Sequence, residues 1–186
     1  MYPFARLAKE FLVFRNAPPL GLCDTHVSHH ICWPWDLDLW LELNNGRALT
    51  LFDLGRLVLA QRVGFGKLVK SKGWLLTIAG STVRYRQRVR MFDRLRMTSR
   101  CVGWDDKFFY LEHAMWKGDA CTSHLLVRMA VTDRNGLVRT VRVLPELGVE
   151  DATPALPEWV AAWSAADSLR PWPPMQDTPA PLARIA

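Results

Sequence analysis

The chain is 186 residues long, with 49% hydrophobic and 23% charged residues. This composition excludes a disordered chain, and the length predicts one domain with a core of its own. Lysine and arginine outnumber aspartate and glutamate by 24 to 18, so the net charge of +6 favours anionic partners such as phosphate-bearing ligands.

The cysteines and the hydropathy pattern indicate the cellular location that we expect for the protein. The cysteines at positions 23, 32, 101 and 121 form no CxxC pair, so reduced thiols and a cytoplasmic location are expected. The apolar cluster at residues 11–14 is shorter than the apolar stretch of a secretory signal. No window approaches the roughly 18 apolar residues of a membrane span, so we expect no stable membrane insertion.

The first third of the chain predicts a leader, a strand and a long helix. Residues 1–22 form a basic leader that ends in a segment with two prolines and a glycine, which stops regular structure. Residues 25–33 are rich in β-branched and aromatic types and predict a strand. Residues 47–63 are apolar except for a narrow polar stripe, which is typical of a mostly buried helix, with Asn44 or Asn45 as its N-cap.

The rest of the chain predicts a sheet. Strands are predicted over residues 74–89, 94–104, 107–116 and 121–132, with turns at 105–106 and 133–136 and an edge strand over 138–143. Residues 156–169 predict a terminal helix, and the proline-rich residues 170–186 predict an extended tail. Because one helix with a wide apolar stripe needs a sheet curved around it, we expect a single α+β domain over residues 23–169.

Three acidic residues crowd the segment before the predicted helix. Asp36, Asp38 and Glu42 stand among leucines and tryptophans, and carboxylates beside apolar walls suit proton transfer. The same three residues also favour the positive end of the helix dipole. Both interpretations stay open on composition alone.

The start of the helix offers backbone donors. The first N–H groups of a helix have no partner within it, and here they belong to Asn45, Gly46 and Arg47. Such amides can hold a developing oxyanion, and a glycine lets a carbonyl approach closely. A carboxylate base beside these amides is enough to hydrolyse an activated ester.

Metal and nucleophile schemes find little support. His26 and His30 share one face of the first strand but lie about 13 Å apart along it, too far to bind one small cation. The sequence contains no GxSxG elbow, no GxxxxGK phosphate loop and no HExxH motif. We expect neither a metal nor a cofactor.

Four arginines alternate along the predicted strand over residues 74–89. The period of two places Arg84, Arg86, Arg88 and Arg90 on one face, either as a solvated outer surface or as a contact for phosphate. No RNP pattern and no basic recognition helix accompanies them, so nucleic acid is not an expected partner.

Several separate motifs resemble one family. Residues 36–47 read DLDLWLELNNGR and residues 51–56 read LFDLGR, which is similar to the acidic loop and central helix of HotDog thioesterases in the 4-hydroxybenzoyl-CoA thioesterase-like branch. VRYR at 83–86 and VGWDDK at 102–107 look closer still to the vertebrate thioesterase superfamily member six group and its bacterial relatives. The resemblance covers about residues 24–165.

The resemblance implies a HotDog fold, in which a five- to six-stranded antiparallel sheet wraps around one long central helix. It also implies homodimers, or dimers of dimers, that bind acyl-CoA at the subunit boundary. The catalytic aspartate of the family falls on Asp38. In the family pattern Asp-x-x-x-His-x-Asn-Asn, the position of the histidine is Glu42 and that of the glycine before it is Leu41.

Two functional hypotheses follow. The first is an acyl-CoA thioesterase in which Asp38 or Glu42 activates water while the amides at Asn45, Gly46 and Arg47 polarise the thioester carbonyl. Its substrate contacts are expected at Asn44, Trp40, Arg84 and Arg86. The alternative is a non-catalytic module that binds acyl-CoA or an acyl carrier.

Overall fold

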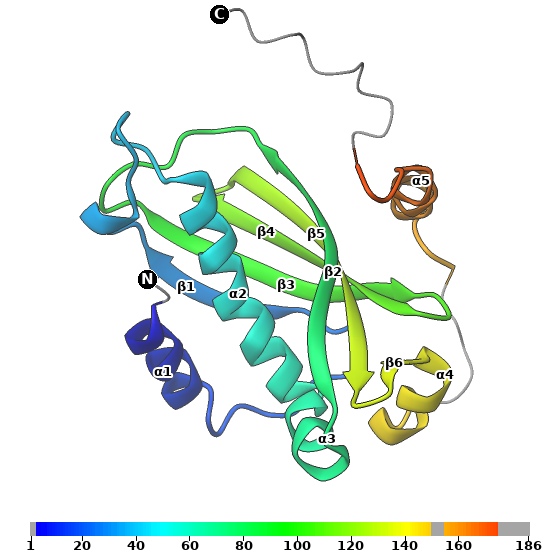
Figure 1. Cartoon of the computed structure of the whole chain (residues 1–186). Helices are drawn as coiled ribbons and strands as arrows, with labels where there is room; N and C mark the ends of the chain where they lie inside the picture. Colours follow the sequence, from blue (N-terminus) through cyan, green and yellow to red (C-terminus); the bar gives the residue numbers. More distant parts are fainter. Residues whose placement is uncertain (1–2, 150–154, 175–186) are drawn as a thin grey trace, which may run out of the picture. The chain divides into compact units, whose positions relative to one another are not determined.

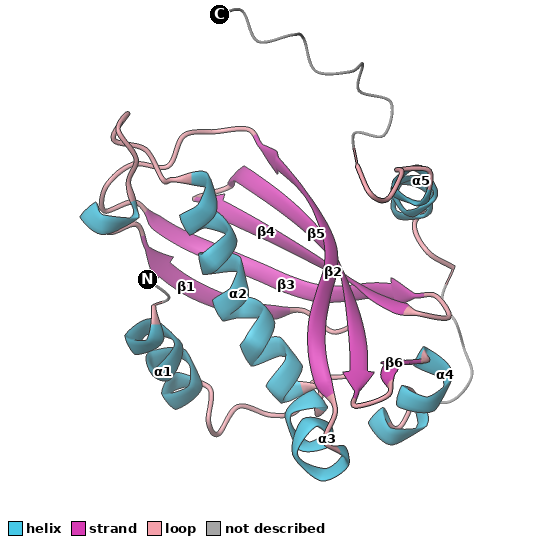
Figure 2. Ribbon diagram, viewed as in Figure 1, coloured by secondary structure: helices cyan, strands magenta, loops and turns pink. Residues whose placement is uncertain are grey.

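The computed structural model describes residues 3–149 and 155–174. Its main feature is an antiparallel sheet with strand order β1-β3-β4-β5-β2, to which β6 adds beside β5 (Figures 1 and 2). The strands are β1 (His26–Ile31), β2 (Leu75–Tyr85), β3 (Arg94–Trp104), β4 (Phe108–Lys117), β5 (Ala120–Asp133) and β6 (Gly136–Val138). The helix α2 (Asn45–Arg62) lies along one face of this curved sheet. The α+β arrangement of one long helix and a sheet is therefore as predicted.

The core fills the space between α2 and the sheet. The strands bury alternate residues, because the side chains of a strand point to its two faces in turn. Phe52 of α2 is fully buried and belongs to the same core cluster as Met97 and Leu95 of β3. Truncating a buried phenylalanine such as Phe52 to alanine costs about 3–5 kcal/mol, so this packing fixes where α2 lies.

One glycine brings α2 close to β3. A Cβ atom added at Gly55 would lie 2.7 Å from Ser99 Oγ and 2.9 Å from Met97 Sδ. Only a residue without a side chain allows this approach. The middle of α2 is thus anchored on the sheet, and its first turn is held in a fixed place relative to β2 and β3.

Two turns form as predicted. Asp105 Oδ1 accepts hydrogen bonds from the backbone amides of Lys107 and Phe108, both at 2.7 Å, and so closes the hairpin between β3 and β4. Asp133 Oδ1 accepts one from the amide of Asn135 at 2.7 Å in the turn between β5 and β6. Aspartate side chains in place of extra backbone bonds make both turns tight.

Three predictions about elements are wrong. The strand predicted to reach residue 89 ends at Tyr85, because the amides of Arg86 and Gln87 both donate to Thr122 O and turn the chain. The arginines from 84 to 90 therefore do not share one strand face. The edge strand predicted over 138–143 ends at Val138, and Thr140–Val143 forms a short helix, α4, before the turn η2 (Pro145–Leu147).

Two helices escaped the sequence analysis. The segment predicted as a leader contains α1 (Phe4–Val13), and the glycine-punctuated stretch after α2 contains α3 (Phe65–Lys72). Gly64 and Gly73 flank α3 with left-handed backbone angles, φ 99° and 67°. These glycines end helices rather than prevent one.

The chain divides into two compact units, residues 1–155 and 156–186. In the second unit, α5 (Glu158–Ser168) confirms the predicted terminal helix. The boundaries at residues 23 and 169 stay predictions, and the predicted tail from residue 175 onward lies outside the described residues. Among the helices that the structure describes, none has the length and apolar character needed to span a bilayer.

Candidate active site

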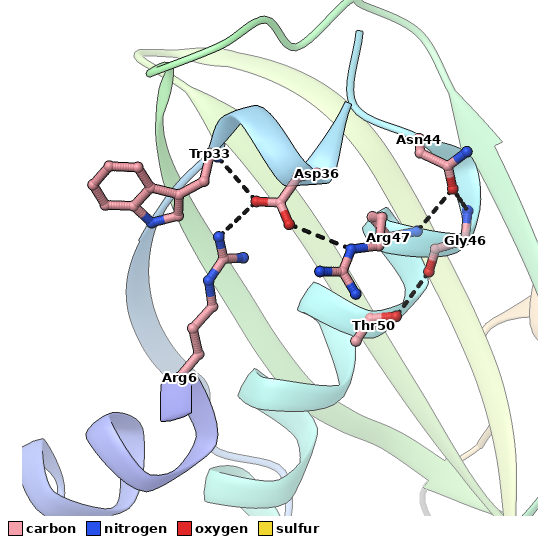
Figure 3. Close-up of polar contacts among 7 residues, drawn as sticks. All are labelled: Arg6, Trp33, Asp36, Asn44, Gly46, Arg47 and Thr50. Atoms are coloured by element: carbon pink, nitrogen blue, oxygen red, sulfur yellow. Dashed lines mark hydrogen bonds and ion pairs between the residues drawn. The ribbon is translucent and has the colours of Figure 1, made fainter. Parts of the chain in front are cut away.

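Asp36 anchors the segment that leads into α2. Its side chain is fully buried, and its Oδ2 accepts a hydrogen bond from Arg6 Nη2 at 2.6 Å and one from the amide of Trp33 at 2.9 Å (Figure 3). Its Oδ1 lies 3.4 Å from Nε of Arg47, which is in the first turn of α2. The charge of Asp36 is therefore matched on both sides, and it ties α1 to the start of α2.

Asp38 and Glu42 close a turn of five residues. The amide of Asp38 donates to Glu42 O at 2.8 Å. In return, Asp38 Oδ1 accepts hydrogen bonds from the amides of Trp40 at 2.9 Å and Glu42 at 3.3 Å. The Asp38 carboxylate is therefore oriented by backbone groups alone, in a half-buried position.

Leu41 has an unusual backbone conformation for a leucine. Its φ is 58°, in the left-handed region that glycine adopts without cost. Leu41 thus takes a conformation that glycine adopts readily, at the position where the resemblance implied a glycine. The leucine side chain itself is 70% exposed.

Glu42 faces an arginine that the sequence analysis did not place at the site. Its Oε1 lies 3.1 Å from Nε of Arg88, and the two side chains are 27% and 73% exposed. The segment after β2 runs beside the loop, because Glu42 forms a backbone bridge with Arg90 and the amide of Leu43 donates to Val89 O at 2.8 Å. Arg88 was predicted only as one of four alternating arginines. Its contact with Glu42 was not predicted, because the strand was expected to continue to residue 89.

Asn44 is the N-cap of α2, as one of the two predicted possibilities. Its Oδ1 accepts hydrogen bonds from the amides of Gly46 at 2.9 Å and Arg47 at 3.2 Å (Figure 3). The sequence analysis left these amides free, and in this conformation they are occupied. An oxyanion can reach them only if the Asn44 side chain turns away.

The end of β2 meets the start of α2. The hydroxyl of Tyr85 donates to Asn45 O at 3.2 Å, a contact that the sequence analysis missed. Burial raises the pKa of Tyr85, so the hydroxyl stays protonated at neutral pH. Arg84, near the end of β2, and Arg86, just after β2, flank this tyrosine in sequence and are both exposed.

Trp40 lies at the exposed tip of the loop. Leu39, Trp40 and Leu41 are 93%, 77% and 70% exposed. Three consecutive large apolar side chains in water are costly, so the tip is suited to contact an apolar group. The structure therefore brings together Asp38, Glu42, Asn44 and the first turn of α2, with Trp40 at the rim.

Over residues 3–149 and 155–174, no three histidine, cysteine, aspartate or glutamate side chains are grouped closely enough to hold a metal ion. The cysteines are unpaired thiols at positions 23, 32, 101 and 121.

Comparison with known proteins defines the class. Residues 32–164 match the family model described as the thioesterase-like superfamily. This range contains the loop, α2 and the whole main sheet from β2 onward. The chain belongs to the thioesterase-like superfamily, and its fold is the HotDog fold that the sequence predicted.

Individual relatives agree with this assignment. The chain is 32% identical over 163 residues to Protein THEM6 of Xenopus laevis, covering 86% of this chain and 77% of the relative. Its fold is similar to a probable thioesterase from Bartonella henselae (TM-score 0.57, 18% identity, 62% and 98% of the two chains). It is also similar to the YbaW probable thioesterase from Escherichia coli (TM-score 0.61, 15% identity, 65% and 94%).

Proposed function

We propose that the protein is an acyl-CoA thioesterase that hydrolyses its substrate by carboxylate-assisted attack of water. Asp38, or Glu42 beside it, accepts a proton from water as the water oxygen bonds to the thioester carbonyl carbon. The C–S bond then breaks, and the proton passes to the departing sulfur, which leaves as the CoA thiol. A free carboxylic acid is the second product.

The surroundings of Asp38 support this role. Its carboxylate is held by the amides of Trp40 and Glu42 and has no arginine or lysine within 4 Å in the described part of the chain. A carboxylate that is oriented by amides and not neutralised by a neighbouring cation is in position to accept a proton from water. Asp36, two residues earlier, is paired with Arg6 and Arg47 and is unsuited to the same task.

The amides of Asn45, Gly46 and Arg47 are the proposed oxyanion donors. For Gly46 and Arg47, the role requires that substrate displace the Asn44 side chain, which would leave Asn44 able to hydrogen-bond substrate instead. The displaced contacts are the two hydrogen bonds of the helix cap, one exposed and one part-buried, and the loss of such a cap costs about 1 kcal/mol.

Substrate contacts are proposed around this centre. Trp40 at the exposed tip is placed to contact the acyl group, and Arg84 and Arg86 to contact the CoA phosphates. Arg88 is added as a third candidate, because it already approaches Glu42. We further propose that the protein works in the cytoplasm as a homodimer or a dimer of dimers, with acyl-CoA bound at the subunit boundary.

Release of CoA thiol from a panel of short, long and aromatic acyl-CoAs tests the proposal. Turnover by the wild type should fall at least about 100-fold in Asp38→Asn, since general base catalysis contributes about 10²–10⁴-fold. Glu42→Gln run beside it assigns the second carboxylate. Acyl-CoA binding without turnover of any substrate would instead support the non-catalytic binding module.

A further inference from the structure

A cavity lies at the edge strand β1. It is a groove of about 620 Å³ between α1 and β1 that extends to β3, and Figure 1 shows α1 beside this edge of the sheet. Ile31 and Trp33 form part of its apolar wall. The groove adjoins the buried Asp36 through Arg6 and Trp33, but Asp38, Glu42 and Asn44 are not among the residues that line it.

The groove carries positive charge that the chain does not neutralise. Its one carboxylate, Glu10, is buried and lies 2.9 Å from Lys9 Nζ. Arg94 and Arg96 line the groove from β3, and neither has a carboxylate within 4 Å in the described part of the chain. Two arginines are therefore available to an anion.

The two arginines are presented in a defined way. They are two residues apart on β3, and they pair across the strands with Ile31 and His29 of β1. Partners in register point to the same face of a sheet, so Arg94 stands beside Ile31. The Arg96 guanidinium lies 5.0 Å from the centre of the Trp116 ring, which restrains its position.

Arg6 of α1 lies on the side of the groove where α1 contacts His30, not beside Arg94 and Arg96. It lines the groove, and its Nη2 is occupied by Asp36. Its Nη1 is buried and has no hydrogen-bond acceptor among the described residues. A buried donor without an acceptor is costly, but an anion bound at Arg94 and Arg96 would not satisfy this one.

The contacting side chains of Ser28, His30 and Glu10 below the groove favour ligand binding over catalysis. Ser28 Oγ lies 2.9 Å from His30 Nε2, and His30 Nδ1 lies 3.8 Å from Glu10 Oε1. This order resembles that of a hydrolytic triad, but Ser28 is only 1% exposed, so a substrate carbonyl has no access to its oxygen. Burial lowers the pKa of His30 to about 3, so its ring is neutral at pH 7 and adds no charge.

We propose that the groove between α1 and β1 binds an amphipathic anion, a small molecule with an apolar body and a single carboxylate or phosphate head. The body packs against Ile31 and Trp33, and the head binds to Arg94 and Arg96. An apolar wall with a few convergent charged groups is the usual composition of a ligand site.

The isoleucines of the chain provide a direct test. There are three, Ile31, Ile78 and Ile185. Ile31 lines the groove, whereas Ile78 lies on β2. With ¹³C-labelled isoleucine methyl groups, titration of the full chain with octanoate or octyl phosphate should shift the Ile31 methyl signal saturably and leave that of Ile78 in place.

Neutral and headgroup-only probes separate the two parts of the proposal. Octan-1-ol and inorganic phosphate should each bind at least about tenfold more weakly than the better of the two amphipathic anions. The relative affinity of octanoate and octyl phosphate identifies the head. An Ile31 signal that does not move with either anion, or that moves equally with octan-1-ol, would overturn the proposal.

Variants of the groove residues complete the test. The double variant Arg94→Ala/Arg96→Ala should raise Kd at least about tenfold. Arg15→Ala/Arg134→Ala removes the same charge from exposed positions elsewhere and should leave Kd unchanged. Ile31→Glu places a carboxylate opposite Arg94 and should also abolish binding. Binding of octanoate to this variant is measured by calorimetry. Equal affinities in the two double variants would contradict the assignment of the arginines.

Discussion

Asp36 and Asp38 stand two residues apart in the same loop and have opposite surroundings. Asp36 is fully buried between the guanidinium groups of Arg6 and Arg47. Asp38 is half-buried and receives only backbone amides, those of Trp40 and Glu42. The loop of residues 36–44 therefore has two parts. The inner part is the buried ion-pair cluster around Asp36, which fixes α2. The outer part is the turn that keeps the Asp38 carboxylate oriented and accessible to water.

The contrast teaches that residue type and position in the sequence do not assign a role. A buried charge that is matched by cations is a structural element whose removal leaves those cations unpaired. A half-exposed carboxylate that no cation matches can change its protonation state during a reaction. The partners of each aspartate, rather than its neighbours in sequence, decide between the two.

The largest expected effect on stability follows from breaking the buried ion pairs of Asp36. Asp36→Asn leaves Arg6 and Arg47 without their anion, and the loss of one partner of a buried ion pair typically costs about 3–5 kcal/mol. We expect a loss of this size in the free energy of unfolding, measured with urea. Asp38→Asn is the matched control and should lose less than about 1 kcal/mol while its turnover disappears. Similar stability losses in the two variants would refute the contrast.

The fold was predictable because its signals are long and periodic. The apolar stripe of α2 and the alternation of β3, β4 and β5 extend over ten residues or more. The failures were local. β2 ends at Tyr85 because Thr122 O accepts two amides, a tertiary contact that no pattern in the sequence records.

The sequence predicted which loop residues form the candidate site but not the contacts that hold them. The sequence identified Asp38, Glu42 and Asn44 as neighbours in one loop, and the structure places them so. It did not reveal that α1 supplies a cation to Asp36, because Arg6 is 30 residues away. Nor did it place Arg88 or Tyr85 at the site. Arg88 lies in the segment after β2, and Tyr85 is the last residue of β2.

A buried histidine on the inner face of the sheet is a second structural group, comparable with Asp36. His113 is fully buried and lies 2.8 Å from Ser99 Oγ. Burial, assisted by the charge of Arg56, lowers its pKa from 6.5 to about 3. The folded protein keeps this ring neutral, whereas the unfolded chain takes up a proton below pH 6.5. Its contribution to stability is therefore complete above pH 6.5 and is lost as the pH falls toward 3.

His113→Asn tests this second structural group. It keeps a polar atom near Ser99 but does not titrate. The wild type should lose on the order of 2 kcal/mol more stability than the variant between pH 7.5 and pH 5, measured with urea at both values. His26 and His30, whose pKa values burial also lowers, leave a similar acid sensitivity in the variant. An identical loss in both proteins would show that His113 does not couple folding to pH.

The smallest expected change in stability is at Asn44, which caps α2 where the loop meets the helix. Asn44→Ala removes the acceptor for the amides of Gly46 and Arg47 and should cost about 1 kcal/mol in the free energy of unfolding. Asn44→Asp keeps the cap, because aspartate serves as well as asparagine at this position, so its stability should be unchanged.

The two variants differ in the charge left beside those amides, and turnover separates them. In Asn44→Asp, a carboxylate bound to the amides of Gly46 and Arg47 opposes a developing oxyanion, so kcat should fall at least about tenfold. Asn44→Ala leaves the amides free and should retain a higher kcat than Asn44→Asp despite its lower stability. If Asn44→Asp instead turned over as fast as the wild type, the oxyanion would have to be held elsewhere, and the first turn of α2 would belong with Asp36 to the structural part of the loop.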